Sequence, residues 1–589
     1  MITKTRPDNK AKGILLPVFS LPSPYGTGCF SEEARAFIDR LSETGHTYWQ
    51  ILPLGPTGVA DSPYQPLSSF AGNAYFIDPA QLVRQGLISE EELAGFDFGN
   101  DPSKIDYDAL FASRIKMLRL AYRRFAAQRL ERGGAVDAAG TADDYDEFVR
   151  KNAFWLEDFA LFMALREKFG RDLSWDDWPE DLRRRKKPAM ERAREEFAED
   201  VDFYRWGQFE FYRQWMELKQ YANAAGVKII GDMPVYVSYD SSDCWADPDQ
   251  FQLGEDLLPK VIAGVPPDEF AAEGQLWGNP LYDWDKMKED GYSWWISRIR
   301  QSFVLYDVIR LDHFRGYEAY YSCAADAENA MNGEWHPGPG MDLFGRLTEA
   351  DVSGAAGCDG ATGDAAGCDG ADPLDPILLP ERFIAEDLGH LTEGVRQLLK
   401  ESGFPGTKVL QFAFDGDPAN PYLTENYKGP CVVYTGTHDN NTTAGWFREL
   451  DQDTRAGILR YLGYTMEEAW WFVLESDAAT LRGERLVDPF KESLEDPFGE
   501  DLESPAGKTD REKIPAKLLD GRIPAKPLDG RLPDPAIIAT ELLIDKAFCS
   551  SAKIAIIPLQ DHLHLGSEAR VNVPGTVVDN WSWRQSGPY

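Results

Sequence analysis

The 589-residue sequence has few cysteines, and it has no long apolar run. Its seven cysteines are odd in number and include no C-x-x-C pair, so they predict neither a disulfide framework nor a zinc or redox motif. No apolar stretch reaches the roughly 18 residues that a membrane-spanning helix needs. The opening residues MITKTRPDNKAKG lack the apolar segment of a signal peptide. These absences favour a reduced, cytoplasmic protein.

Positive charge is also scarce relative to negative charge. The chain has 98 acidic and 61 basic residues, which gives a formal net charge of −37. Such a surface repels phosphate backbones and anionic lipid, so we expect neither nucleic acid nor a membrane as a partner. A neutral ligand such as a sugar is compatible with it. The proportions of apolar residues (43%) and charged residues (27%) are typical of a globular protein.

Short apolar runs that end in polar or acidic residues recur along the chain. They occupy residues 46–58, 227–237, 306–316, 382–389, 431–443 and 553–561. Continuous hydrophobicity is typical of strands buried on both faces of a parallel sheet. Segments between them, such as 391–403, have helical spacing, so the sequence predicts an α/β fold. Six polar strand ends favour a (β/α)8 barrel with helical and loop insertions over a doubly wound sheet.

Three parts of the sequence interrupt this alternation. Residues 85–225 are charged, aromatic and helical in pattern, which predicts a mostly helical inserted subdomain beside a single catalytic barrel spanning residues 1–589. In residues 351–373 the string AAGCDGA occurs twice, and residues 480–535 combine an acidic stretch with the near-repeat IPAKLLDGR and IPAKPLDGR. Repeats of this composition bury little apolar surface and predict low-complexity insertions. A role in docking a partner is the alternative.

Three carboxylates stand at the ends of predicted strands: Asp312 in VIRLDHFRG, Glu386 in IAEDLG and Asp439 in YTGTHDNNT. Arg310 precedes Asp312 by two residues and shares its strand face. A nearby guanidinium lowers the pKa of a carboxyl and keeps it anionic, as a nucleophile requires. A glutamate at an apolar strand end has a raised pKa, as a general acid requires. Retaining glycoside chemistry uses such a pair about 5–5.5 Å apart. Each acid taken alone is more often a strand-end cap or a salt-bridge partner.

An ordered set of strings resembles the α-amylase clan and, taken together, the 4-α-glucanotransferases of the amylomaltase and disproportionating-enzyme family. The strings are GILLPVFSLPSPYGTG (13–28), SPYQPLSSFAGNAYFID (62–78), GDMPVYV, GVPPDEFAAEGQLWGNPLYDWD (264–285), RLDHFRG, AEDLG, GTHDNNT, PLQDHLHLGSEARVNVPG (558–575) and VNVPGTVVDNWSWR (571–584). The resemblance covers nearly the whole chain outside the two repeat-containing insertions. Because it starts at residue 13, we expect no additional N-terminal domain.

The resemblance implies the role of each carboxylate in a retaining transfer through a covalent glucosyl-enzyme. Asp312 would be the nucleophile, Glu386 the general acid/base and Asp439 the transition-state stabiliser. The side chains implied to contact the sugar or the nucleophile are those of Arg310, His438, Asp232, Tyr64, Ser62, Gln275, Trp277, Asn279 and Phe270. The expected substrates are maltooligosaccharides and longer α-1,4-glucans, and nothing in this chemistry calls for a metal or a cofactor. The sequence does not give the oligomeric state.

The chain departs from the family pattern at three positions. Glu269 replaces a tyrosine that relatives commonly carry beside Phe270, in a segment that forms a lid over the donor site in this family. Asn441 and His564 stand where aspartate and glycine are more common. Because a lid aromatic helps to exclude water, Glu269 leaves a plain α-glucan hydrolase as an alternative. A catalytically inactive glucan-binding protein is the alternative from another class.

Other residues have more modest implied roles. Tyr107 is a candidate for a second, remote glucan contact, and His313 is a candidate for supporting the loop after the nucleophile. Arg570 and Asn572 belong to the family's closing loop, which we expect to seal the barrel beneath the active site.

Overall fold

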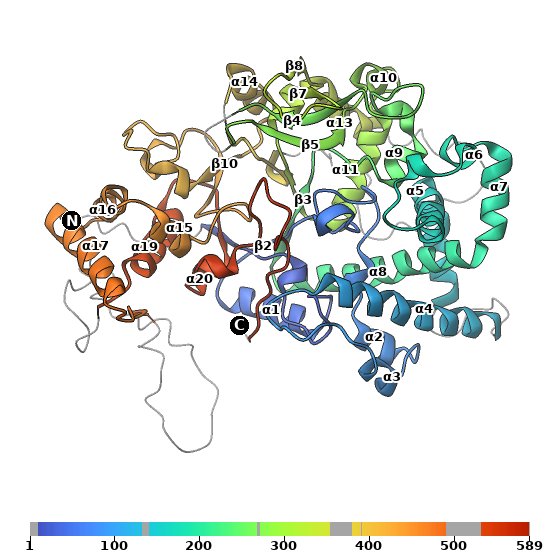
Figure 1. Cartoon of the computed structure of the whole chain (residues 1–589), viewed down its shortest axis with the longest axis horizontal. Helices are drawn as coiled ribbons and strands as arrows, with labels where there is room; N and C mark the ends of the chain where they lie inside the picture. Colours follow the sequence, from blue (N-terminus) through green and yellow to red (C-terminus); the bar gives the residue numbers. More distant parts are fainter. Residues whose placement is uncertain are drawn as a thin grey trace. The chain divides into compact units, whose positions relative to one another are not determined.

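The computed structural model describes residues 10–131, 141–267, 271–353, 380–389, 391–490 and 532–587. Within them, eight strands close a barrel in the order β1-β12-β11-β10-β9-β6-β3-β2. Figure 1 labels β2, β3 and β10 among them. Their bounds are β1 Ala11–Leu15, β2 Tyr48–Gln50, β3 Lys228–Met233, β6 Val308–Leu311, β9 Phe383–Ala385, β10 Gly406–Val409, β11 Cys431–Tyr434 and β12 Ile554–Pro558. The predicted (β/α)8 barrel is confirmed.

Each of the six predicted apolar runs contains a barrel strand, but two strands have no counterpart among them. β1 reads AKGIL, so Ala11, Lys12 and Gly13 precede its two apolar residues. β10 is only four residues long and reads GTKV, with no apolar run. β1 is buried over its last three residues, and β10 is buried at three of its four residues. Their own sequences nevertheless carry too little hydrophobicity to predict them.

The chain forms two compact units, one of Met1–Leu15 with Lys408–Val573 and one of Leu16–Thr407 with Pro574–Tyr589. The helices of the larger unit are α1 Glu32–Glu43, α2 Pro79–Arg84, α3 Glu90–Ala94, α4 Tyr107–Glu131, α5 Thr141–Phe169, α6 Glu180–Arg183, α7 Lys187–Glu196, α8 Ala198–Ala224, α9 Ser242–Ala246, α10 Trp284–Glu289, α11 Ser293–Leu305, α12 Arg315–Glu318, α13 Gly340–Ser353 and α14 Glu393–Ser402. A small antiparallel sheet in this unit has the order β5-β4-β7-β8, with bounds β4 Val261–Val265, β5 Gln275–Pro280, β7 Ala319–Ala324 and β8 Glu334–Pro337.

Helix α14 illustrates how local sequence sets the helix ends. The Thr392 hydroxyl accepts a hydrogen bond from the backbone N–H of Val395, and Gly403 ends the helix in a left-handed conformation with φ 70°. A threonine cap and a C-terminal glycine satisfy backbone groups that a helix leaves unpaired. The helix predicted over 391–403 is therefore confirmed.

Aromatic pairs hold helices α4, α5 and α8 together, and Figure 1 shows these helices near one another in the larger unit. Ring centroids lie 5.5 Å apart for Tyr145 and Phe209 and 6.0 Å apart for Trp155 and Tyr212. Trp215 is fully buried, and its indole N–H donates to the Leu305 carbonyl at 3.0 Å. Most aromatic residues of this region thus serve helix packing, because buried rings contribute large contact areas.

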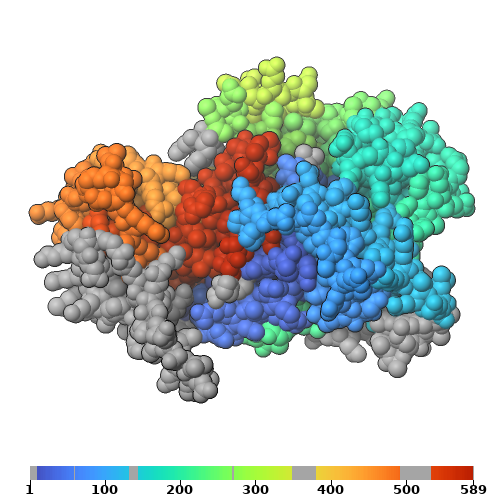
Figure 2. Space-filling model, turned by 60° about the horizontal axis from the view of Figure 1, so that its bottom comes forward, coloured from blue at the N-terminus to red at the C-terminus, as the bar shows by residue number. Residues whose placement is uncertain are grey.

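The smaller unit has the helices α15 Thr443–Glu449, α16 Gln452–Tyr461, α17 Met466–Leu481, α19 Pro535–Cys549 and α20 Leu559–His562. Phe447, Leu459, Phe472 and Ile538 belong to one buried core cluster that joins α15, α16, α17 and α19. Figure 2 shows α16 and α17 in orange at the surface of this unit. No helix in the described part of the chain is long and apolar enough to cross a membrane.

A buried ion-pair cluster fixes the chain after α20. His564 has a left-handed backbone, with φ 56°. Its Nδ1 lies 2.8 Å from the Asp488 carboxylate and its Nε2 lies 2.7 Å from the Glu541 carboxylate. Burial lowers the pKa of His564, but the two hydrogen-bonded carboxylates outweigh that effect and raise the pKa to about 9. The histidine thus joins Asp488, which lies within the predicted 480–535 insertion, to helix α19 and to the loop after α20.

We predict that His564→Asn lowers the free energy of unfolding by about 2 kcal/mol at pH 7, because two buried carboxylates lose their shared cation. Asparagine tolerates the left-handed conformation, so backbone strain changes little. A raised folded-state pKa means that the stabilisation is complete below pH 6.5 and is lost as the pH rises through about 9.

Denaturant unfolding of both proteins between pH 6 and pH 10 tests this prediction. His336→Asn is the matched control, since His336 bonds to the Ser322 hydroxyl and not to carboxylates. A difference between wild type and His564→Asn that stays constant over this pH range would contradict the assignment of His564 as a buried cation.

Candidate active site

A buried arginine organises the carboxyl ends of β3 and β6. Arg310 Nη1 donates to both carboxylate oxygens of Asp232 at 2.7 Å and to Asp312 Oδ1 at 3.0 Å. Asp232 lies opposite Arg310 in the β3–β6 register. Burial lowers the pKa of Arg310, but the charges of Asp232 and Asp312 outweigh that effect and hold the pKa well above its ordinary value. The guanidinium therefore stays charged and stabilises both acids as anions.

The two acids differ in access to solvent. The Asp232 side chain is fully buried, whereas that of Asp312 is 23% exposed. Only Asp312 can meet a ligand from outside, while Asp232 serves to hold Arg310. Asp232 is linked to Asp312 through the shared Arg310. The reactive role of Asp312 and the expected contact of Asp232 with the sugar or the nucleophile stay predictions.

Glu386 is tied to the backbone of the residue that follows Asp312. It comes directly after β9, which neighbours β6 with Leu311 opposite Ala385. The backbone N–H of His313 donates to Glu386 Oε2 at 2.6 Å. The N–H of Phe314 donates to the Glu386 carbonyl at 3.1 Å. The carboxylates of Asp312 and Glu386 thus project from adjacent strand ends that share a short backbone bridge.

His313 makes that bridge in an unfavourable backbone conformation. It has a left-handed backbone with φ 46°, which is uncommon for a residue other than glycine. Its ring packs edge-on against Trp277 with centroids 4.9 Å apart. Burial, with a smaller contribution from Arg315, lowers its pKa to about 4, so the imidazole is neutral at physiological pH. Such strain persists where surrounding contacts enforce it, and the predicted supporting role of His313 agrees with this geometry.

The loop around Tyr64 connects the buried arginine cluster to strand β5. The Tyr64 hydroxyl donates to Asp232 Oδ2 at 2.8 Å, and the Tyr64 N–H donates to the Ser62 hydroxyl at 3.2 Å. Gln65 and Asn279 exchange two hydrogen bonds of 3.0 and 3.1 Å through their amide groups. Gln65 was absent from the residues expected from sequence. Its place in the SPYQ string, directly after Tyr64, was the available signal.

The predicted lid residues fall in two groups. Glu269 and Phe270 lie outside the described residues. Gln275, Trp277 and Asn279 lie on β5, and the Trp277 indole N–H donates to Gln275 Oε1 at 3.2 Å. Gly278, between Trp277 and Asn279, has a left-handed backbone with φ 75°, and the β4–β5 register shifts at this point, so β5 is irregular there.

In the smaller unit, Asp439 lies in the loop that follows β11. The side-chain amide of Asn572 donates to Asp439 Oδ1 at 2.6 Å, and Arg570 Nη2 donates to the Asp439 carbonyl at 2.7 Å. His438 Nε2 lies 3.3 Å from Asp439 Oδ2, and the Asp439 side chain is 45% exposed. Arg570 and Asn572 therefore act directly on Asp439, a more specific contact than the sealing role expected from sequence.

A buried acid, Asp561, holds the same loop, and it was not among the residues expected from sequence. Asp561 accepts hydrogen bonds from the hydroxyl of Thr435 at 2.6 Å and from the N–H and hydroxyl of Thr443 at 2.7 and 2.6 Å.

The Asn441 amide donates to Glu449 at 2.7 Å. The aspartate commoner in the family would place a carboxylate against Glu449, so the asparagine suits its surroundings.

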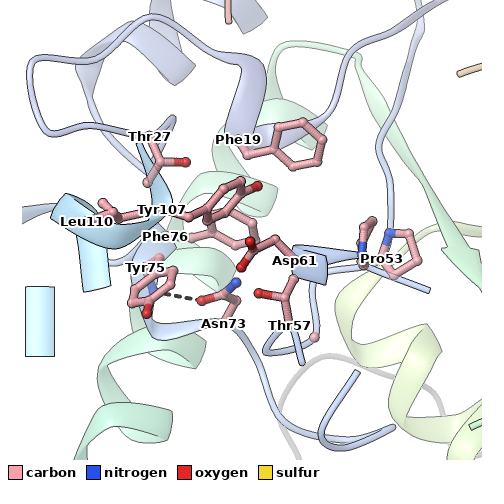
Figure 3. A pocket seen from close by; sticks show the side chains of 12 residues that line it. Phe19, Thr27, Pro53, Thr57, Asp61, Asn73, Tyr75, Phe76, Tyr107 and Leu110 are labelled. Atoms are coloured by element: carbon pink, nitrogen blue, oxygen red, sulfur yellow. Dashed lines mark hydrogen bonds between the residues drawn. The ribbon is translucent and has the colours of Figure 1, made fainter. Parts of the chain in front are cut away.

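Figure 3 draws a small pocket in the larger unit, whose lining residues include neither Asp312 nor Glu386. Asp61, Tyr75, Asn73 and Tyr107 are among the residues that line it. Burial, with a smaller effect of nearby Asp108, raises the pKa of Asp61 to about 6. The Tyr107 hydroxyl donates to the Trp581 carbonyl at 2.8 Å, so its polar end is already engaged within the protein.

The comparisons with known proteins come from sequence and structure. The 4-alpha-glucanotransferase family model matches residues 16–497 and 508–588. The chain is 39% identical to a 4-alpha-glucanotransferase of Thermus thermophilus, covering 98% of this chain and 94% of the relative. It is 37% identical to one of Clostridium butyricum, covering 96% of this chain and 94% of the relative.

Solved structures agree with these matches. The amylomaltase of Streptococcus agalactiae in complex with acarbose is 33% identical, with a TM-score of 0.77, and the match covers 98% of this chain and 95% of that one. The amylomaltase of Corynebacterium glutamicum has the same fold at 20% identity, with a TM-score of 0.62 and coverage of 98% and 71%. The chain belongs to the 4-alpha-glucanotransferase family.

Proposed function

We propose that this protein transfers segments of α-1,4-glucans to the 4-hydroxyl of an acceptor glucan or glucose by a retaining double displacement. Asp312 is the nucleophile, Glu386 the general acid/base and Asp439 the transition-state stabiliser. The observation that carries the proposal is the solvent-accessible Asp312 held by the buried Arg310, beside Glu386 on the adjacent strand end. Family membership supports the choice of reaction.

In the first displacement, an Asp312 oxygen attacks C1 of a glucose residue while Glu386 donates its proton to the departing glycosidic oxygen. A bond forms between C1 and Asp312, and the fragment with the reducing end leaves. The charge of Arg310 keeps Asp312 anionic before attack, and it also stabilises the carboxylate as a leaving group in the second step. Asp439 accepts hydrogen bonds from sugar hydroxyls as the ring distorts.

In the second displacement, Glu386 removes the proton from the 4-hydroxyl of the acceptor, whose oxygen attacks C1. The C1–Asp312 bond breaks, and an α-1,4 linkage forms again. Transfer exceeds hydrolysis when the acceptor is positioned and water is excluded. The residues that we propose to contact the sugar in the donor subsite or the nucleophile are those expected from sequence: Arg310, His438, Asp232, Tyr64, Ser62, Gln275, Trp277, Asn279 and Phe270.

We also propose that the substrates are neutral maltooligosaccharides and longer glucans and that the enzyme works in the cytoplasm, without nucleic acid, membrane or cofactor. The net charge of −37 supports a neutral substrate. The cysteines within the described residues, Cys29, Cys244, Cys323, Cys431 and Cys549, are free thiols, which supports a reducing compartment. The division of the chain into one catalytic barrel with a helical subdomain and repeat-containing insertions stays a prediction.

We predict that incubation with pure maltotriose yields glucose together with maltopentaose and longer chains, while the number of reducing ends stays constant. Chromatography of the products and a reducing-end assay over time measure both quantities. Rising reducing ends without longer products would instead favour the hydrolase, with water as acceptor. No conversion at all would favour an inactive glucan-binding protein.

We predict that Asp312→Ala lowers transfer activity by about 10³-fold or more, because no other group can form the covalent intermediate. Asp326→Asn, which changes an exposed carboxylate elsewhere in the same unit, should retain wild-type activity. Initial rates with maltotriose measure both variants. An Asp312→Ala protein that is folded and nearly as active as wild type would remove Asp312 from the mechanism.

We predict that Glu386→Ala is inactive with maltotriose but turns over α-maltosyl fluoride when azide is present. Fluoride leaves without protonation and azide attacks without a general base, so both functions of Glu386 become dispensable. The product should be α-maltosyl azide, since two displacements retain configuration. A β-azide, or no rescue of the folded variant, would contradict the assignment of Glu386.

A further inference from the structure

Trp581 lies in a strained conformation near the end of the chain. Its φ of 59° is left-handed, as is the φ of 61° at Asp579. For a bulky residue this region is rarely occupied, and it costs about 1–3 kcal/mol. Strain of this kind persists only when neighbouring contacts enforce it, so neighbouring contacts must hold Trp581 in this conformation.

Three hydrogen bonds with the single segment 103–107 hold this part of the chain in place. The Tyr107 hydroxyl donates to the Trp581 carbonyl at 2.8 Å. The Ile105 N–H donates to the Ser582 carbonyl at 2.8 Å, and the Arg584 N–H donates to the Ser103 carbonyl at 2.8 Å. Tyr107 and Phe76 both line the pocket drawn in Figure 3. The backbone at Trp581 is therefore set by contacts on both sides.

The indole ring of Trp581 is directed onto Tyr64. The ring centroids lie 5.7 Å apart at an angle of 44°, and Trp581 is only 6% exposed. The hydroxyl of Tyr64 donates to Asp232, which shares Arg310 with Asp312. A chain of direct contacts thus runs from Trp581 through Tyr64, Asp232 and Arg310 to the proposed nucleophile.

We infer that Trp581 is a positioning residue for the proposed transfer reaction: the Tyr107 hydroxyl fixes its backbone, and its ring holds Tyr64 where the phenol hydrogen-bonds Asp232 and so sets how Arg310 is shared with Asp312. This inference rests on the proposed role of Asp312. The Tyr64 hydroxyl neutralises part of the negative charge of Asp232. Without it, Asp232 draws Arg310 more strongly, and Asp312 becomes less well stabilised as an anion and less well oriented for attack.

Single variants separate the ring from the backbone strain. Trp581→Gly relieves the left-handed strain but removes the ring, and we expect kcat for maltotriose disproportionation to fall about 10- to 100-fold with a smaller change in KM. Trp581→Phe keeps an aromatic ring against Tyr64 and should recover most of the activity. Val578→Ala changes a side chain that is 72% exposed in the same segment and is the matched control. Full activity of Trp581→Gly would overturn the inference.

The pH profile tests the route through Arg310. Because Asp312 loses part of its cation, the acid limb of kcat/KM should move to higher pH in Trp581→Gly and in Tyr64→Phe, but not in Val578→Ala. A role confined to folding would lower the amount of active enzyme and leave the position of the acid limb unchanged. Thermal unfolding of each variant shows whether the protein is folded.

A double-mutant cycle tests whether Trp581 acts through Tyr64. In the Tyr64→Phe background, Trp581→Gly should add less than about 2-fold, since the hydroxyl that Trp581 positions is already absent. Independent, multiplying losses would overturn the inference. Asp312→Ala separates the two hypotheses: if it retains activity, the proposed mechanism fails, whereas if it is inactive and Trp581→Gly is unaffected, only the role of Trp581 fails.

Discussion

One buried guanidinium is the interaction on which the proposed site depends. Arg310 lies between the carboxylates of Asp232 and Asp312, and it is only 3% exposed. A charge removed from water in this way is tolerated only when it is paired and hydrogen-bonded. Two acids satisfy it, and because one is inaccessible and the other is open to solvent, the pair divides naturally into a structural and a reactive carboxylate. The ends of β3 and β6 cannot shift independently without breaking this arrangement.

Strained backbone accumulates around this arginine. His313, directly after Asp312, and Trp581, packed on Tyr64, both have positive φ angles. Each is held there by hydrogen bonds from neighbouring segments: His313 donates its N–H to Glu386, and Trp581 accepts from Tyr107. Conformational strain at a reactive centre is stable only when the surrounding fold over-determines it. The large, aromatic-rich unit supplies that support.

The smaller unit uses hydrogen bonds around carboxylates in the same way. Asp561, only 1% exposed, gathers the loop after β11 through Thr435 and Thr443. Asn572 and Arg570 then fix Asp439 from a loop far along the chain. Asp312 and Asp439 are partly exposed, whereas Arg310, which binds Asp312, and Asp561, which holds the loop of Asp439, are buried. Such an arrangement keeps reactive groups in position before a substrate binds.

The sequence by itself predicted the barrel and placed three candidate acids at predicted strand ends, because both depend on local signals, whereas the roles of the acids came from the family resemblance. Continuous apolar runs predicted six of the barrel strands, and the polar residues at their ends included Asp312, Glu386 and Asp439. β1 and β10 were missed, since four or five residues with little hydrophobicity carry no such signal. Only the tertiary structure decided which groups hold these acids. The contacts of Trp581 with Tyr64 and of Asn572 with Asp439 join residues far apart in the chain, and hydrophobic periodicity, which reports only which face of an element is buried, does not encode hydrogen-bond partners across such separations.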